Sequence, residues 1–349
     1  MKKVKHINFE VTLKGNGIVN YDSGDQKYLW NRESKGGNKN VFTSVDNNNM
    51  YAKKVYFKNE DGDLDYKIKI SSDALRNAIF KGDAIATNPS IQHHKPLLNS
   101  FIGSTLGLVR GYMFADKETL KRKSPLTITS AIQSDDDVSV SYMEFHSRSG
   151  QKKVYNDSDS KDTTIFNKED IGNITYSAEG FIDVQELQFL SADPIFDRCN
   201  FNADDYELLK TFLSVNLPNY DSELGYYTLK TSAIDVSEYG IKLNNDNVVY
   251  LIKETLKRIL SIKIGKANAY VKINSLKVQL LDNPIDARNA VWVDLNSFED
   301  IDNLSFEIEE AYVLKEESEA KKQREEVENN IKLATNAKED HKKSKKEIK

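Results

Sequence analysis

Basic residues gather in three short stretches of the first half of the chain. Arg110 lies between two glycines in GLVRG, and KRKSP carries Lys121, Arg122 and Lys123. The third stretch, YMEFHSRSGQKK, interleaves rings with cations: Tyr142, Phe145, His146, Arg148, Lys152 and Lys153. Cations follow a phosphate backbone, and aromatic rings stack on unpaired bases. Each stretch alone is also typical of a solvated face, but their concentration predicts single-stranded nucleic-acid binding.

A candidate phosphate site lies at the start of a helix in DYKIKISSDALRNAIF. Residues 66–70 alternate as in a half-buried strand, and Ser71 and Ser72 then offer N-cap hydroxyls. Arg76 follows near the first turn, where free N–H groups already carry partial positive charge. A phosphate bound by those N–H groups, the hydroxyls and the guanidinium resolves this conflict. A surface pair between Arg76 and Asp73 is the alternative.

Patterns for catalysis or metal binding are weak. Asp22 and Asp25 in DSGD, and the acidic triplet 135–137, could hold magnesium, but both read more simply as turns or solvated loops. His93 and His94 are adjacent and lack the partners of a zinc site, and we count both among the candidate RNA-binding residues instead. No phosphate-binding glycine loop, dinucleotide fingerprint or nucleophile elbow is present. We therefore expect no enzyme activity, no cofactor and no metal.

Composition and charge bound the class of protein. The chain has 349 residues, 39% hydrophobic and 30% charged, which allows one large domain or two small ones. It has no long apolar run and no secretory signal, and Cys199 is its single cysteine, so a reducing, cytoplasmic setting without membrane contact is expected. Residues 1–134 contain 21 Lys and Arg and 13 Asp and Glu, a net charge of +8. The rest of the chain contains 28 Lys and Arg and 41 Asp and Glu, a net charge of −13. This asymmetry suits polyanion binding or head-to-tail association of copies.

The elements that must position these residues follow from periodicity. Strands are predicted at 5–21, with a bend or bulge at Gly15 and Gly17, and then near 51–58, 64–70 and 268–281. Helices are predicted after Ser71, at 204–213 and from about 245, whereas 22–49 and 86–104 read as loops and 105–114 as either strand or helix. From 126 the pattern becomes β-like, with two arms around a polar segment that predict a projecting hairpin. The order favours an α+β fold with a ferredoxin-like or RNA-recognition-like core.

The last 35 residues differ in composition. From Lys315 the chain is strongly charged and has few aliphatic residues, which predicts a helical or disordered solvated tail. We expect truncation after Leu314 to leave assembly on RNA almost unchanged.

Several motifs in the same order resemble those of a known family. ISSDALRNAIF, HHKPLLNSFIGSTLGLVRGYMF, KRKSPLTITSA and DIGNITYSAEGFIDVQELQFLS together resemble the repeated backbone (Cas-seven-type) subunit of class 1 CRISPR RNA-guided surveillance complexes, in the RAMP superfamily. The type I-F variant and type IV proteins are the most similar. The resemblance covers roughly residues 5–305, and the start of the helix at Ser71 and KRKSPL are its most specific parts.

The resemblance implies a palm over residues 1–310, with an irregular web at about 82–125 and a thumb hairpin at about 135–185, followed by a tail at 311–349. It implies a non-catalytic antiviral subunit that oligomerises along a CRISPR RNA, with target nucleic acid, further copies and other CRISPR subunits as partners. Ser71, Ser72 and Arg76 would hold guide phosphates, and the thumb would insert between guide bases. Two alternatives remain: a metal-dependent ribonuclease using Asp22 or Asp25, and a structural protein that polymerises without RNA.

Overall fold

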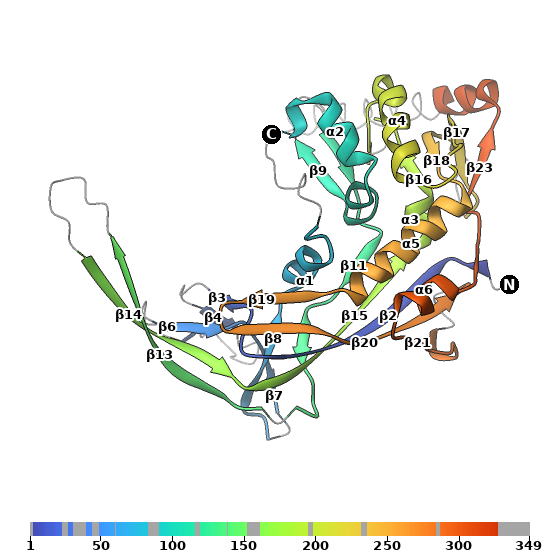
Figure 1. Ribbon diagram of the computed structural model, residues 1–349. Coiled ribbons are helices and arrows are strands. Elements are labelled where there is room, and N and C mark those ends of the chain that lie inside the picture. Colours follow the sequence, from blue (N-terminus) through green and yellow to red (C-terminus); the bar gives the residue numbers. More distant parts are fainter. Residues whose placement is uncertain are drawn as a thin grey trace, which may run out of the picture.

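A nine-stranded antiparallel sheet is the centre of the molecule (Figure 1). The computed structural model describes residues 3–22, 27–30, 40–43, 49–59, 61–82, 91–115, 119–137, 139–151, 161–194, 198–231, 236–283 and 287–326. The strand order is β19-β20-β2-β15-β12-β8-β7, with β11 also pairing with β15 and β21 with β20. The bounds are β2 His6–Asn16, β7 Lys54–Lys58, β8 Leu64–Ile70, β11 Leu126–Ile128, β12 Ala131–Gln133, β15 Asn173–Asp183, β19 Lys263–Lys266, β20 Ala269–Leu281 and β21 Val293–Leu295.

Strand β2 shows why these residues form a sheet. Its apolar side chains alternate, so that Ile7, Phe9, Val11 and Leu13 are buried on one face while the residues between them point to the other. The expected irregularity is present but lies earlier than predicted, between Thr12 and Leu13 in the pairing with β20. The strand ends before Gly17, whose φ of +76° favours glycine.

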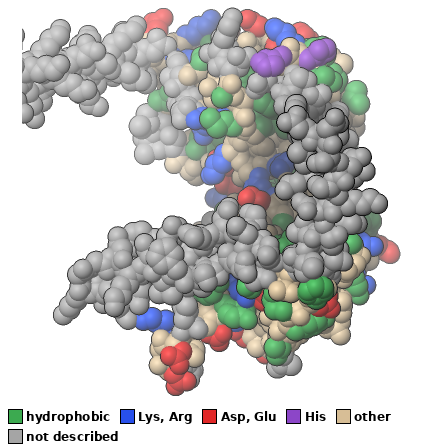
Figure 2. Space-filling model, turned by 90° about the vertical axis from the view of Figure 1, so that its left-hand side faces the viewer, with side chains coloured by type: hydrophobic (Ala, Val, Ile, Leu, Met, Phe, Trp, Pro, Cys, Tyr) green, Lys and Arg blue, Asp and Glu red, His purple; other side chains and the backbone are tan. Residues whose placement is uncertain are grey.

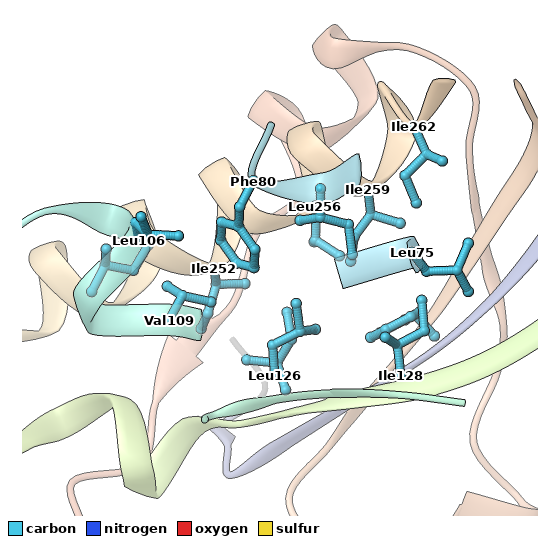
Figure 3. Close-up of a cluster of buried hydrophobic side chains, with 14 of the residues drawn as sticks. Leu75, Phe80, Leu106, Val109, Leu126, Ile128, Ile252, Leu256, Ile259 and Ile262 are labelled. Atoms are coloured by element: carbon cyan, nitrogen blue, oxygen red, sulfur yellow. The ribbon is translucent and has the colours of Figure 1, made fainter. Parts of the chain in front are cut away.

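Two amphipathic helices cover the apolar face of the sheet (Figures 1 and 3). Helix α1 (Ser72–Ile79) is capped by Ser71 and α5 (Asn245–Leu260) by Asn244, whose side chains each accept a backbone N–H bond. Figure 3 shows their apolar side chains meeting those of β11 in one core: Leu75, Phe80, Leu126, Ile128, Ile252, Leu256 and Ile259. Along the chain, β2, α1, β11 and β12, β15, α5 and β20 follow a β-α-β-β-α-β order. The predicted α+β class is confirmed.

A second, four-stranded sheet forms the upper part of Figure 1. Its order is β16 (Phe189–Ser191), β18 (Glu238–Lys242), β17 (Leu224–Leu229) and β23 (Tyr312–Lys315). The rings of Phe189 and Tyr312 stack with centroids 4.7 Å apart in its small apolar cluster. Helices α2 (Lys95–Ile102), α3 (Val184–Gln188) and α4 (Tyr206–Asn216) lie beside it in this part of the molecule.

Residues 86–90 of the expected loop lie outside the described part, and the segment from 91 to 115 differs from the sequence prediction. Instead of irregular chain throughout, it contains α2, which begins with Pro96 in its first turn, where proline needs no N–H partner. The undecided residues 105–114 are both helix and strand: a π-helical turn at Leu106–Arg110 leads into β9 (Tyr112–Ala115), which pairs with β10 (Thr119–Arg122). Gly111 joins the two with a φ of +74°.

A long β-ribbon projects from the central sheet (Figure 1). It is formed by β13 (Ser141–Gln151) and β14 (Lys161–Ile171), with β6 (Asn49–Ala52) parallel to β14 at its base and β3 (Tyr21–Asp22) beside β6. The predicted hairpin is therefore present, but its second arm was assigned wrongly. Residues 173–183, expected in that arm, form β15 beside β2 in the central sheet because their alternating apolar side chains are buried.

The C-terminal segment does not begin as a solvated tail. Strand β23 belongs to the second sheet, and residues 317–326 form a helix in which Ala320 is fully buried. Arg324 of this helix forms an ion pair with the buried carboxylate of Asp193, and its guanidinium lies 5.5 Å from the Tyr226 ring centroid. The expected division at residue 310 thus cuts through packed structure; residues 327–349 lie outside the described part.

The remaining elements are short. They are β1 (Lys3–Val4), β4 (Lys27–Trp30), β5 (Asn40–Thr43), β22 (Glu307–Ile308), α6 (Phe298–Asn303) and the 3-10 turns Ile91–His93 and Ala203–Asp205. Among the residues described, no helix is both long and apolar enough to span a bilayer.

Candidate nucleic-acid interface

Two arginines from different segments lie side by side: Arg76 in α1 and Arg110 at the end of the π-helical turn. The Arg76 guanidinium donates to the carbonyl oxygens of Arg110 (2.6 Å) and Leu126 (3.2 Å), while Arg110 donates to the Asn77 side-chain oxygen at 2.9 Å. Burial and then the positive charge of Arg110 lower the pKa of Arg76, and Asp73 opposes them. Within the described part of the chain neither arginine forms an ion pair with a carboxylate. Two like charges held together in this way favour an anion beside them.

The helix start itself is less open than the sequence suggested. The Ser71 hydroxyl accepts bonds from the Ala74 N–H and the Asn20 amide, and the Ser72 N–H donates to Ser130. Arg76 in turn finds its partners in backbone carbonyls rather than requiring a phosphate. Ser71, Ser72 and Arg76 therefore form the frame of the site, and Arg110, which is half-buried, is its second cation.

Arg122 was predicted to contact RNA, and this prediction is wrong. Its side chain is buried and donates to the carbonyl oxygens of Leu108, Phe189 and Glu186 at 2.8–2.9 Å, and to the Asn200 side chain at 3.3 Å. Alternation along β10 explains this: the strand sends Arg122 inward and its neighbours to the other side. Arg122 ties the turn before Gly111 to α3, and so fixes the segment that carries Arg110.

Lys121 and Lys123 point away from the core. Lys123 is exposed, with a weak 3.7 Å contact to Glu186, and Lys121 is half-buried. Gly111 brings these lysines close to Arg110, because a Cβ at its position would lie 2.5 Å from the Arg122 carbonyl oxygen. The basic residues of GLVRG and KRKSP, which are separate in the sequence, are thus adjacent in the structure.

The two histidines belong to another part of the molecule. His93 ends the 3-10 turn before α2 and His94 is the N-cap residue of α2; both are exposed. Helix α2 packs against α4 in the upper part of Figure 1, whereas α1 lies lower, at the central sheet. The structure does not bring His93 and His94 to the arginine cluster.

The projecting ribbon carries exposed apolar side chains. Tyr142, Met143 and Phe145 of β13 are 50%, 47% and 71% exposed. Tyr142 and Phe145 are three residues apart in a strand, so they face opposite sides of the ribbon rather than forming one stacking surface. His146 and Arg148 lie in β13, but their side chains, and all of Lys152 and Lys153, fall outside the described residues.

A buried ion pair anchors the ribbon at its base. The Glu169 carboxylate lies 2.9 Å from the Lys54 ammonium and also accepts from the Ala52 N–H (2.9 Å) and the Ser141 hydroxyl (2.7 Å). The Lys54 ammonium lies 4.0 Å from the Tyr66 ring centroid. Four strands thus meet at Glu169. The sequence reasoning missed this residue, because nothing local distinguishes it from a solvated glutamate.

The surface between the upper part and the ribbon is hollowed. Figure 2 shows Lys and Arg side chains, with a few acidic ones, on the upper wall of this hollow. Helix α1 lies at its inner end in Figure 1. Helix α1, which carries Arg76, therefore lies between the upper part and the ribbon.

In the described part of the chain, the aspartates considered as magnesium ligands do not form a metal centre. Asp135 pairs with Lys67, and Asp137 accepts from the backbone N–H groups of Ser139 and Thr175. No group of three or more potential ligands is found among the described residues. The side chain of Asp22, and Asp25 altogether, lie outside them.

Comparison with known proteins gives one extensive match. A family model described as type I-Fv CRISPR-associated protein Cas7fv-like matches residues 3–289. Among solved structures, a chain of a "CRISPR RNA-guided surveillance complex" aligns with a TM-score of 0.31 and 12% identity, over 80% of this chain and 71% of that one. A chain of a "CRISPR RNA-guided surveillance complex, pre-nicking" aligns with a TM-score of 0.37 and 8% identity, over 80% and 79%. Both structural likenesses are distant. The curated proteins include no match.

Proposed function

The chain belongs to the Cas7fv-like family of type I-Fv CRISPR-associated proteins, and from this premise we propose that it is a non-catalytic backbone subunit that coats a CRISPR RNA in several copies. In this role it acts in an antiviral surveillance complex, together with other CRISPR subunits and a target nucleic acid paired with the guide. The predicted palm, web and thumb correspond in this proposal to the central sheet with α1 and α5, the segment around α2 and β10, and the ribbon β13–β14.

The observation that carries the proposal is the arginine cluster. Arg76 and Arg110 are held together without a carboxylate, and at Gly111 the backbone that follows Arg110 runs close to that of Arg122 and Lys123. Such an arrangement costs electrostatic free energy in the free protein and is stabilised by phosphates. A guide RNA running past α1 supplies several phosphates to these cations.

The ribbon adds a second contact with the guide. Its exposed Tyr142 and Phe145 lie on opposite faces, so a ribbon inserted between two bases can contact one base on each side. Neighbouring bases would then be separated at regular intervals along the RNA. Copies arranged head to tail along one strand form a heterologous, filament-like assembly.

The decisive experiment compares Arg110→Gln with the parent protein in guide RNA binding over a range of salt concentrations. Loss of one phosphate contact should lower affinity and reduce the salt slope of log K by about 0.7, with an unchanged melting temperature. His93→Gln is the matched control, because the structure places His93 beside α2, and it should leave the slope unchanged. An unchanged slope for Arg110→Gln would show that the guide does not contact this cluster.

A further inference from the structure

The face of the central sheet opposite α1 and α5 carries a row of lysines. Lys14 of β2 is paired directly with Lys272 of β20, which is paired in turn with Lys263 of β19. Directly opposed residues in antiparallel strands point to the same face. The buried neighbours Leu13 and Val271 face the helices, so the three lysines point away from them; all three are exposed.

These lysines have no acidic partner in the described part of the chain. None of the ion pairs found there involves Lys14, Lys263 or Lys272. Farther along the same face of β20, Lys277 has Asp294 3.9 Å away. Like charges placed directly opposite one another destabilise a sheet. The row therefore lowers the stability of the free protein, and a bound anion would remove this penalty.

The row borders a concave surface rather than a flat one. Lys14 and Lys272 line a hollow of about 1120 Å³, together with the exposed ring of Tyr270 and hydrogen-bonding side chains such as Thr175 and Asn274. Neighbouring strands lie about 4.8 Å apart, so the three ammonium groups extend across roughly 10 Å. That distance suits two or three successive phosphates of an extended strand.

The opposite rim of the hollow is acidic. Asp135, Asp136 and Asp137 line it, with Lys67 paired to Asp135 and Asp137 bound to the backbone of its own turn and of Thr175. These carboxylates repel a phosphate backbone from their side. They restrict a polyanion to the side formed by β2, β20 and β19, where Tyr270 offers a ring for stacking.

We infer that this lysine row is a second binding site for single-stranded nucleic acid, on the face of the sheet opposite α1 and independent of guide binding. Phosphates contact Lys14, Lys272 and Lys263, and an unpaired base stacks on Tyr270. The two sites bind different strands, because the sheet separates them.

The test uses the full-length protein, free and after assembly with guide RNA. A fluorescein-labelled oligothymidylate of about 12 nucleotides is titrated in at several salt concentrations and followed by anisotropy. The triple variant Lys14→Gln, Lys263→Gln, Lys272→Gln should bind the oligothymidylate at least about tenfold more weakly. The slope of log K against log salt concentration should decrease in magnitude by about 2, because each lost contact removes roughly 0.7. Tyr270→Leu should weaken binding without changing the slope.

Matched controls make the outcome specific. Lys272→Gln should weaken oligothymidylate binding more than Lys277→Gln on the same face of the same strand. Guide RNA affinity should not change in the triple variant, whereas Arg110→Gln should change guide binding only. A further outcome is that Arg110→Gln leaves guide binding intact while the triple variant still loses affinity for oligothymidylate. That result would contradict the proposed guide site and support the second site.

Two results would overturn the inference. One is oligothymidylate binding that is the same in the triple variant and the parent. The other is a triple variant that self-associates less in sedimentation without nucleic acid but still binds oligothymidylate normally, which would assign the row to an acidic surface of another copy.

Discussion

At the scale of single residues, neighbouring basic side chains have opposite roles. Arg122 and Lys123 are adjacent in KRKSP, yet one is buried with four hydrogen bonds and the other is exposed. We predict that Arg122→Met lowers the free energy of unfolding by at least about 3 kcal/mol, because several buried acceptors lose a charged donor. Lys123→Gln should change it by less than about 0.5 kcal/mol and weaken guide RNA binding instead. Urea unfolding followed by circular dichroism measures both; equal stability of the two variants would contradict the assignment.

The sequence predicted which segments are basic but not which basic side chains are free. Had β10 been recognised as a strand, its alternation would have placed Lys121 and Arg122 on opposite sides. The acceptors of Arg122 come from residues 108, 186, 189 and 200, and a single sequence does not show that these residues meet. The carbonyl partners of Arg76, on Arg110 and Leu126, come from distant segments for the same reason.

At the scale of elements, the ribbon depends on its anchor. We predict that Glu169→Gln destabilises the protein by about 3 kcal/mol, since Lys54, only 13% exposed, loses its counter-charge. The double variant Lys54→Met, Glu169→Leu should recover part of this loss, but not all, because Ala52 and Ser141 still lose their acceptor. A double-mutant cycle measures the coupling, and additive effects would show that the pair does not hold the ribbon.

Strong periodicity made most elements predictable, and weak periodicity explains the errors. Strands β2, β8 and β20 and helices α1 and α5 have alternating or helical apolar patterns, and the structure confirms them. Strand β14, in contrast, has the largely polar sequence KDTTIFNKEDI and pairs with β13. Its polar sequence has no clear apolar alternation that would predict a strand. The apolar β15 was therefore assigned to the second arm of the hairpin.

At the scale of the whole molecule, the C-terminal helix is part of the fold. Asp193 is completely buried, and its partner Arg324 lies 131 residues away in the sequence. We predict that truncation after Leu314 clearly lowers the melting temperature, because it removes Arg324 and the buried Ala320. Truncation after Glu326 keeps both contacts and serves as the control. Identical melting curves for the two truncated forms would contradict the packing of this helix.

The central claim is that copies of this chain coat one guide RNA, and its most direct test is the mass of the complex formed with guides of increasing length. Native mass spectrometry of the full-length protein with such a series counts the copies bound to each RNA. The account predicts that the number of copies rises in single steps as the guide lengthens, and that little assembly occurs without RNA. A copy number independent of guide length, or equally large assemblies in the absence of RNA, would contradict it.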